Sequence, residues 1–379
     1  MKIDGAWLHD PATQAVCAML TGAGHQALFV GGCVRNALLH AAVTDIDIAT
    51  DATPDRVVAL AKAADLKPVP TGIDHGTVTV VANGKPHEVT TFRRDVATDG
   101  RHATVAFSAR IEEDAARRDF TMNALYARPD GTVVDPLDGL PDLGARHVRF
   151  VGDPARRIRE DYLRILRFFR FTAWYGDPAL GMDAEGLAAC AAGMEGLPGL
   201  SRERIGSEIR KLLSAPDPAP ATASMAQAGI LAALLPGTDT RALAPLIHLE
   251  GDLPPRWLRR LAVLGGEDPT DALRLSRAEQ RDLAALRTEI PTTTAPAPLA
   301  YRHGADLATD ALLLRAALLE QPLPAHWQDD VARGAAARFP VTAADLPGLV
   351  GPALGQELKR LEKAWLASDL RLTRSQLLA

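Results

Sequence analysis

The 379-residue sequence predicts an α+β fold, in which a region of mixed strands and helices precedes an all-helical remainder. Two patterns lead to this prediction. Short β-type runs alternate with helical patterns from Ala27 to about Val134, and after Asp153 apolar residues recur at every third and fourth position while β-type runs disappear. An apolar content of 47% is enough for a substantial core, and the length indicates two or three domains.

In the mixed region, five short runs rich in Val, Ile, Thr and Phe predict strands, and residues 53–64, "TPDRVVALAKAA", predict a helix. The segment 93–108, "RRDVATDGRHATVAFS", has weak periodicity and several Asp and Gly residues. We expect it to form a mobile loop. The predicted strand runs are "ALFV", "IDIA", "TVTVV", "HEVTTF" and "TVVD".

In the helical region, "DPARRIREDYLRILRFFRFTAWYG" predicts one amphipathic helix, because its apolar residues form a stripe opposite its charged residues. Two stretches rich in Pro, Ala and Thr interrupt the helical pattern, "SAPDPAPATAS" from Ser214 and "IPTTTAPAPLA" from Ile290. We expect these stretches to be loops or linkers.

Composition excludes several classes of protein. The three cysteines, Cys17, Cys33 and Cys190, are far apart and form no metal-binding or disulfide pattern, which fits a reducing cytoplasm. The N-terminal residues lack the basic and apolar segments of a signal peptide, and no long uncharged apolar run occurs, so we expect neither export nor membrane insertion. The net charge of -5 argues against non-specific coating of nucleic acid, although a local basic face remains possible.

The stretch "FVGGCVRNALL" joins a predicted strand to a predicted helix through Gly31 and Gly32. Backbone N–H groups at such a turn, beside the N-terminus of a helix, suit a phosphate group. Arg35, one turn into the helix, adds a charged fork for the same oxygens. A pair of glycines before a helix also occurs as simple turn geometry.

Two aspartates follow the glycine pair in the same stretch of sequence. Together with the glycine pair they favour a ligand-binding site over simple turn geometry. In a strand, residues two apart point to the same side, so Asp45 and Asp47 of "DIDIA" would project together. Their mutual repulsion is tolerable where a divalent cation lies between them, and hard oxygen ligands favour Mg²⁺. Glu88, on a later strand, is a candidate for a third carboxylate that binds a second ion or acts as a general base. The alternative is a strand end with solvated acids.

Five blocks occur in the order found in one known family. They are "GGCVRNALL...DIDI", "EVTTFRRDVATDGRHATVAFS", "RRDFTMNALY", "DPLDGLPDL" and "REDYLRILRFFRF", within residues 27–171. The chain thereby resembles bacterial tRNA nucleotidyltransferases of the poly(A) polymerase type, the CCA-adding enzymes of the polymerase β superfamily. It departs from the usual GGxVRD at one place, where Asn36 replaces the expected Asp.

The resemblance implies a polymerase-β-like nucleotidyltransferase head over residues 1–150, a helical neck over 151–215, and a helical body and tail over 216–379 that bind tRNA. It assigns Asp45 and Asp47 to Mg²⁺, with Glu88 as a further catalytic carboxylate. It assigns the incoming nucleotide to Gly31, Gly32, Arg35, Arg118, Asp161, Arg164, Arg167 and Arg170.

The resemblance further implies that the helix around Asp161 selects the base of the incoming nucleotide. The spacing of Asp161 and Arg164 is consistent with this role. Asp161 and Arg164 would project about 60° apart on one helix and so would face the same ligand edge. Asp161 would accept from the exocyclic amino group of cytosine or adenine, and Arg164 would donate to the ring nitrogen beside it. Guanine and uracil would leave these groups unpaired, at a cost of about 1–3 kcal/mol or more. The alternative is an ordinary amphipathic helix with solvated ion pairs.

The function predicted from the resemblance is addition of C, C and A to the 3′ end of tRNA from CTP and ATP, without a template. The body would contact tRNA, and Arg256, Arg259 and Arg260 are either such contacts or ordinary helix surface. A poly(A) polymerase, an enzyme that adds only CC or only A, and a catalytically inactive RNA-binding module are the alternatives. "DPLDGLPDL" predicts a turn with structural roles for Asp135 and Asp138.

Overall fold

The computed structural model describes residues 1–73, 76–98 and 103–379 of the chain. These residues form two compact units. The first comprises Met1–Glu208 with Gln227–Ala233, and the second comprises Ile209–Ala226 with Leu234–Ala379. The mixed sheet lies in the first unit, and after Asp153 the described residues contain helices but no strand, as the sequence predicts.

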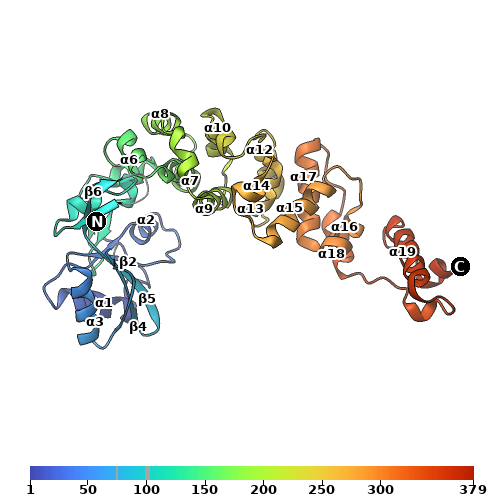
Figure 1. Cartoon of the computed structure of the whole chain (residues 1–379), viewed down its shortest axis with the longest axis horizontal. Helices are drawn as coiled ribbons and strands as arrows, with labels where there is room; N and C mark the ends of the chain where they lie inside the picture. Colours follow the sequence, from blue (N-terminus) through green and yellow to red (C-terminus); the bar gives the residue numbers. More distant parts are fainter. Residues whose placement is uncertain (74–75, 99–102) are drawn as a thin grey trace. The chain divides into compact units, whose positions relative to one another are not determined.

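A seven-stranded mixed sheet forms the centre of the first unit, with the strand order β3-β4-β5-β2-β1-β8-β9. Strand β2 pairs with β5 in parallel, whereas the other neighbouring strands pair antiparallel. Helices α1 (Pro11–Thr21) and α3 (Pro54–Ala63) pack on each other and on this sheet (Figure 1). The strands are β1 Leu28–Val30, β2 Asp47–Thr50, β3 Lys67–Gly72, β4 Thr77–Ala82, β5 Lys85–Thr91, β8 Tyr126–Ala127 and β9 Val133–Val134.

All five predicted strand runs lie in this sheet. The observed bounds of the strands differ from the predicted ones, and the described residues contain more strands than were predicted. Strand β2 begins at Asp47, so Asp45 precedes the strand rather than belonging to it. Strands β3 and β8 were not predicted. The predicted mobile loop is also wrong in part, because β6 (Arg93–Thr98) and β7 (Ala103–Phe107) pair as a separate two-stranded sheet. Its tip, residues 99–102, lies outside the described residues.

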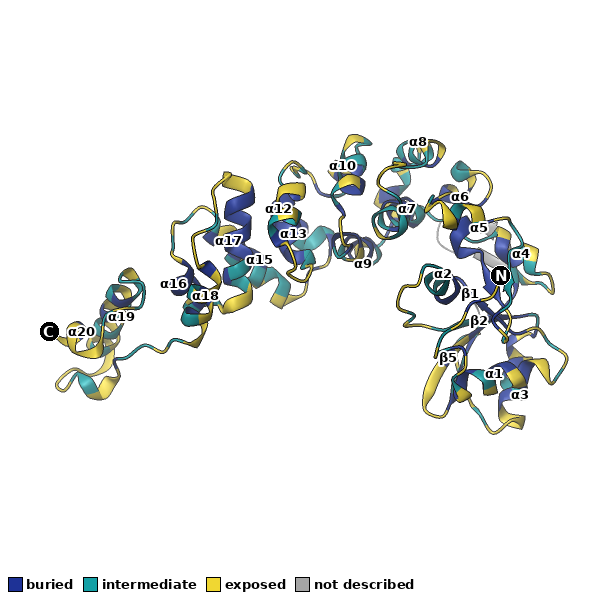
Figure 2. Cartoon of the chain, turned by 180° about the vertical axis from the view of Figure 1, so that it is seen from behind, coloured by how far each residue is buried: buried dark blue, intermediate teal, exposed yellow. Residues whose placement is uncertain are grey.

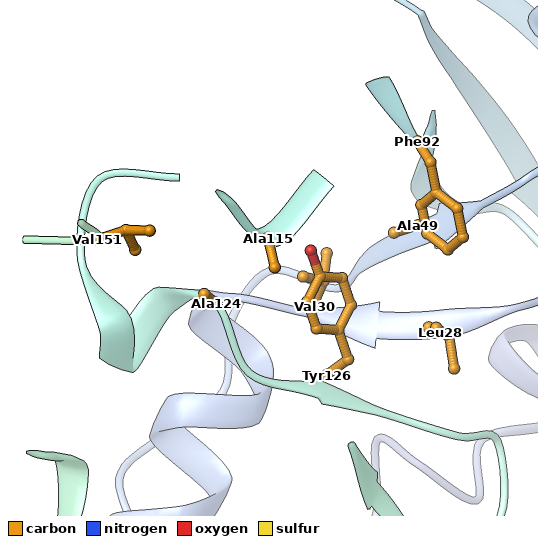
Figure 3. Close-up of a cluster of buried hydrophobic side chains, with 8 residues drawn as sticks. All are labelled: Leu28, Val30, Ala49, Phe92, Ala115, Ala124, Tyr126 and Val151. Atoms are coloured by element: carbon orange, nitrogen blue, oxygen red, sulfur yellow. The ribbon is translucent and has the colours of Figure 1, made fainter. Parts of the chain in front are cut away.

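Buried side chains from strands and helices join in a core cluster beside β1. Strand β4 alternates half-buried and buried residues, the pattern of a strand with one face on the core. Figure 3 shows the cluster, in which Tyr126 lies among Leu28, Val30 and Ala115 with its hydroxyl directed toward α4 (Ile111–Ala116). The hydroxyl thus connects the apolar core to a polar group on α4.

The helix predicted from Asp153 onward is interrupted. Helix α6 (Pro154–Glu160) ends before Asp161, whose backbone is extended, with φ −155° and ψ 105°. The Asp161 Oδ1 atom accepts a hydrogen bond from the Leu163 N–H at 3.1 Å, and α7 (Leu163–Tyr175) begins there. An Asp side chain that accepts from a backbone N–H at a helix start favours such a break, since it satisfies a donor without an intrahelical partner.

The remaining elements of the first unit are short helices. Asp135 accepts hydrogen bonds from the Gly139 and Leu140 N–H groups, which confirms its predicted structural role at the start of α5. These helices are α2 Gly32–Leu38, η2 Thr121–Asn123, α5 Leu140–Gly144, α8 Ala184–Ala192, η3 Met194–Gly199 and α11 Ile230–Leu234, whose last residue belongs to the second unit. Helix α9, Arg202–Leu213, begins in the first unit and continues into the second.

The second unit is helical throughout its described elements. Both stretches predicted as loops contain the start of a helix, because proline is accommodated in the first turn, as at Pro296. None of the described helices in either unit is long and apolar enough to cross a membrane. The helices are α10 Ala219–Gln227, α12 Leu243–Glu250, α13 Trp257–Leu264, α14 Pro269–Ala272, α15 Arg277–Glu289, α16 Pro296–His303, α17 Ala305–Leu319, α18 Trp327–Ala336, η4 Ala343–Asp345, α19 Gly351–Ala367 and α20 Arg374–Leu378.

A cluster of charged residues is buried inside the second unit around α13, which is coloured mostly as buried in Figure 2. Arg259 and Arg260 are each 1% exposed. Glu250 accepts from the Nε of Arg259 at 2.7 Å and from the Nη2 of Arg260 at 2.6 Å, and Asp310 accepts from the Nη1 of Arg259 at 2.9 Å. Neither expectation for these two arginines was right, since they lie in the core and not on a helix surface or at RNA. Arg256, half-buried, pairs with Asp310 at 3.4 Å.

Candidate active site

The glycine pair forms the junction between β1 and α2. Gly31 has φ +70°, a conformation that L side chains rarely adopt, and its N–H donates to the Leu125 carbonyl at 3.1 Å. Gly31 therefore serves the turn and has no free N–H for a phosphate, contrary to the expectation for this residue. Gly32, the first residue of α2, lines an open cavity of about 250 Å³ beside the turn.

Both predicted metal-binding aspartates line that same cavity. Asp45, exposed, lies just before β2, and Asp47, half-buried, is its first residue. The pair therefore faces the glycine turn and Arg35 across one open space. The full lining consists of Gly32, Cys33, Arg35, Asn36, Val43, Thr44, Asp45, Asp47 and Tyr175.

Negative charge gathers around Asp47. Burial raises the pKa of the Asp47 carboxyl, the neighbouring Glu88 and Asp45 carboxylates raise it further, and the Arg118 guanidinium opposes them. Glu88 lies opposite Asp47 in the parallel β2–β5 pair, but it is exposed and does not line the cavity. Carboxylates that repel one another at an open cavity fit a divalent cation.

The donor set around the cavity limits how such a cation would be held. Within residues 1–73, 76–98 and 103–379, no three His, Cys, Asp or Glu side chains are grouped closely enough to hold a metal ion by themselves. Asp45 and Asp47 can supply two hard oxygen ligands. The protein side chains therefore fit an ion that completes its coordination with water and with the phosphate oxygens of a ligand.

Arg35 is 6% exposed, and among the described residues its hydrogen-bond acceptors are uncharged oxygen atoms. Its Nη1 donates to Asn123 Oδ1, its Nε and Nη2 donate to Asn36 Oδ1, and its Nη2 also donates to the Tyr175 hydroxyl at 2.8 Å. Burial lowers the pKa of the Arg35 guanidinium. At the position where the resemblance expects Asp, Asn36 thus accepts from Arg35 and donates from its Nδ2 to the Ala42 carbonyl.

Arg118 is held by a buried carboxylate. Asp114, 1% exposed on α4, accepts from Arg118 Nη2 at 2.9 Å, from Arg117 Nε at 2.9 Å and from the Tyr126 hydroxyl at 2.7 Å. A Cβ atom on Gly31 would lie 3.4 Å from Arg118 Nη1. The guanidinium therefore extends from Asp114 to the glycine turn, next to the cavity that holds Asp47.

A second buried carboxylate, Asp119, connects Arg167 to Arg35. Asp119 Oδ2 accepts from Arg167 Nε at 2.7 Å, and Asp119 Oδ1 accepts from Asn123 Nδ2 at 2.9 Å. Because Asn123 Oδ1 accepts from Arg35, a continuous hydrogen-bonded chain links α7 to α2. Burial by itself raises the pKa of Asp119, but the Arg167 guanidinium outweighs it, and the pKa falls to about 2.

The predicted base-selecting residues are not on one helix, because α6 ends before Asp161. Arg164 Nη1 donates to the Arg157 carbonyl and to Glu160 Oε2, and its Nη2 donates to the Arg117 carbonyl at 2.9 Å. Asp161 and Arg164 therefore do not project from one helix, and the prediction from helical spacing is wrong. The alternative of solvated ion pairs along one helix is not borne out either, because Glu160 ends α6, Arg164 belongs to α7, and their side chains are only 11% and 13% exposed.

The other two predicted members, Asp161 and Arg170, each form an ion pair with a residue outside the predicted set. Asp161 Oδ2 accepts from Arg204 Nη2 at 2.7 Å. Arg170 donates to Glu208 Oε2 at 2.5 Å and does not line the cavity.

Three residues of this site were not predicted from the sequence, namely Asp114, Asp119 and Tyr175. The spacing of four between Asp114 and Arg118 is a signal that could have revealed the first, since residues at i and i+4 are neighbours on a helix. Tyr175 lines the cavity and contacts Arg35 of α2 although the two residues are far apart in the sequence, and no local pattern indicates that contact.

Two family models match the chain. One, described as the poly A polymerase head domain, covers residues 27–149, and the other, described as the probable RNA and SrmB-binding site of polymerase A, covers residues 182–241. The first range includes the glycine turn, both aspartates and Arg118.

Curated relatives are similar over part of their length. The human mitochondrial CCA tRNA nucleotidyltransferase 1 is 43% identical over 190 residues, which are 50% of this chain and 44% of that protein. The CCA-adding enzyme of Geobacillus thermodenitrificans is 38% identical over 259 residues, 67% of this chain and 59% of that protein. The chain thus spans about half the length of the curated relatives that it matches.

A solved structure is similar over nearly its whole length. The crystal structure of the Bacillus stearothermophilus CCA-adding enzyme in complex with CTP has a TM-score of 0.74 and 30% identity, and the match covers 95% of this chain and 94% of that one. An agreement of this extent in sequence and fold shows common descent and not convergence on a shared architecture. The chain belongs to the tRNA nucleotidyltransferase and poly(A) polymerase family of CCA-adding enzymes.

Proposed function

We propose that the protein adds C, C and A to the 3′ end of tRNA from CTP and ATP. In this reaction the 3′ hydroxyl of the RNA attacks the α-phosphorus of the nucleotide, the new phosphodiester bond forms, and pyrophosphate leaves. One observation carries the proposal: Asp45 and Asp47 line a single cavity together with Gly32 and Arg35. The similarity to a CCA-adding enzyme crystallised with CTP supports the choice of substrate.

Nucleotidyltransferases of this family need divalent metal ions. We infer that the ion here is Mg²⁺ and that Asp45 and Asp47 hold it, since hard carboxylate oxygens prefer it. When bound, the ion would lower the pKa of the attacking hydroxyl and balance the charge on the leaving pyrophosphate. Glu88, beside Asp47 in register, is our candidate for a general base or for a ligand of a second ion.

The positive groups around the cavity would bind the triphosphate. Arg35 is buried and Arg118 is half-buried, and hydrogen bonds hold both in fixed orientations, so little side-chain entropy is lost when a phosphate binds. Gly32 lets the phosphate approach the first turn of α2. Arg167, which is held by Asp119 and stacks near Phe171, would support the base or a phosphate from α7.

We still propose that Asp161 and Arg164 select the base. They do so from either side of the junction between α6 and α7, and not from one continuous helix. Two backbone carbonyls and Glu160 orient the Arg164 guanidinium, and the break between α6 and α7 directs Asp161. A carboxylate acceptor and a fixed donor match the amino group and ring nitrogen of cytosine and adenine. Arg170, whose Nε donates to Glu208, is a further proposed nucleotide-binding residue.

We propose that the helical neck, body and tail, residues 151–215 and 216–379, hold the tRNA by its shape and phosphates. The buried Arg259 and Arg260 are excluded from that role. We place the reaction in the cytoplasm, in keeping with the three isolated cysteines of the sequence.

The test uses tRNA transcripts that end before the first C, after the first C and after the second C. The wild type should add CCA, CA and A, respectively, and then stop. Poly(A) synthesis, or extension of only one transcript, would identify one of the related activities instead. Asp45→Ala and Asp47→Ala should each abolish incorporation with unchanged far-UV circular dichroism, whereas Asp55→Ala, at an exposed carboxylate on α3, should retain it. Turnover by both cavity variants would refute the assignment.

A further inference from the structure

Tyr175 lies in the cavity although it comes from α7, a helix outside the matched head domain. It is the last residue of that helix, and it lines the same space as Asp45 and Asp47. The other lining residues belong to the segment from Gly32 to Asp47. Among the described residues, Tyr175 is therefore the lining residue that comes from α7. The others lie between the glycine turn and the start of β2.

The ring and the hydroxyl of Tyr175 both contact Arg35. The guanidinium carbon of Arg35 lies 4.0 Å from the centroid of the Tyr175 ring, and the hydroxyl accepts from Arg35 Nη2 at 2.8 Å. Phe171, one turn earlier on α7, packs against the Tyr175 ring with centroids 5.3 Å apart. The aromatic pair therefore fixes one side of the guanidinium.

Within the described part of the chain, no carboxylate accepts a hydrogen bond from the Arg35 guanidinium. Its acceptors are the side-chain oxygens of Asn36, Asn123 and Tyr175, which are all uncharged. A buried cation without an anionic partner is costly, and a phosphate that enters the cavity would supply that partner.

The Tyr175 hydroxyl also retains a donor. A phenol can accept one hydrogen bond and donate another. It accepts from Arg35, and across the described part of the chain no acceptor is recorded for its own O–H. Because the residue lines the cavity, this O–H can donate to a ligand oxygen there.

We infer that Tyr175 is a further nucleotide-binding residue, whose hydroxyl donates to a phosphate oxygen of the incoming triphosphate while it holds Arg35 toward the same group. The inference rests on the proposed function for the identity of the ligand. It assigns Tyr175 to the triphosphate and not to the base, so its loss should affect CTP and ATP alike.

The test compares Tyr175→Phe with Tyr301→Phe. The first change keeps the ring and removes only the hydroxyl. The second removes a hydroxyl that donates to Glu362 at 2.6 Å in the second unit, and it controls for the loss of one tyrosine hydrogen bond. Tyr175→Phe should raise the KM for CTP and for ATP by about tenfold each, the change that one hydrogen bond to a charged group produces, with kcat nearly unchanged. Tyr301→Phe should leave both values as in the wild type.

A second measurement does not require turnover. Calorimetry with inorganic tripolyphosphate and Mg²⁺, in the absence of tRNA, should show affinity about tenfold weaker for Tyr175→Phe than for the wild type and Tyr301→Phe. Equal affinities would overturn the inference, as would a KM change for only one of the two nucleotides or a loss of kcat at constant KM. If the wild type binds tripolyphosphate but adds no nucleotide to tRNA, the proposed function fails while this inference is still tested.

Discussion

Asp114 offers the clearest link between a buried interaction and substrate binding. Although burial by itself raises the pKa of its carboxyl, the Arg118 and Arg117 guanidiniums outweigh this effect, and the pKa falls from the ordinary 3.8 to about 2. At about 1.4 kcal/mol for each pH unit, the charged form gains about 2 kcal/mol from its surroundings in the fold. Removal of one partner from a buried ion pair costs more, about 3–5 kcal/mol, because the other charge stays buried and unpaired.

We therefore expect Asp114→Asn to lower the free energy of unfolding by about 3 kcal/mol. The amide nitrogen would face a guanidinium, so Arg118 would lose its orientation toward the glycine turn. The KM for CTP should then rise at least about tenfold. Urea unfolding measures the stability, and initial rates with a tRNA that lacks CCA measure the KM.

Asp142→Asn is a matched control, because Asp142 pairs with Arg149 at 2.8 Å in the same unit but does not contact Arg118. It should change stability slightly and leave the KM for CTP as in the wild type. If Asp114→Asn loses stability but binds CTP normally, then Asp114 does not position Arg118 for the nucleotide, and the reasoning is refuted.

Two further predictions concern stability. Glu250→Gln should lower the free energy of unfolding of the second unit by about 3 kcal/mol, because two buried guanidiniums lose their shared carboxylate. Urea unfolding followed by tryptophan fluorescence measures this loss. A change below about 1 kcal/mol would contradict the prediction. Acid should destabilise the first unit, because Asp114 and Asp119 both have pKa values lowered to about 2. A carboxyl whose pKa is lowered in the fold adds stability that is fully present above its unfolded pKa of 3.8 and is lost as the pH falls toward about 2. The melting temperature should therefore drop between these two pH values. The drop should be smaller in Asp114→Asn, which lacks one of the two carboxyls.

Local patterns predicted the parts of the fold that local chemistry determines. The strand runs and the glycine turn follow from side-chain alternation and from the conformational freedom of Gly31. The two aspartates line one cavity as expected, although Asp45 precedes β2 and strand alternation does not place it there. The role of these residues in catalysis stays a prediction until the variants are measured.

The helix break at Asp161 and the burial of Arg259 and Arg260 could not be predicted from local patterns. The first depends on a capping hydrogen bond that competes with apolar periodicity, and the second depends on contacts between residues distant in the sequence. Apolar periodicity continues across Asp161, and only the capping bond to Leu163 shows that the helix breaks there. Arg259 and Arg260 have the appearance of a helix surface, because their partners Glu250 and Asp310 lie 9 to 51 residues away in the sequence. The strands β6 and β7 have few apolar residues in alternation, so their pairing left little trace in the sequence.

The buried charges of the second unit have a practical consequence for handling the protein. Dissolved ions screen charges in contact with water, but they cannot reach Arg259, Arg260 and their carboxylate partners. Attraction to RNA phosphates, in contrast, weakens steeply as the salt concentration rises. A high-salt wash should therefore strip bound nucleic acid during purification while the helical half of the chain stays folded.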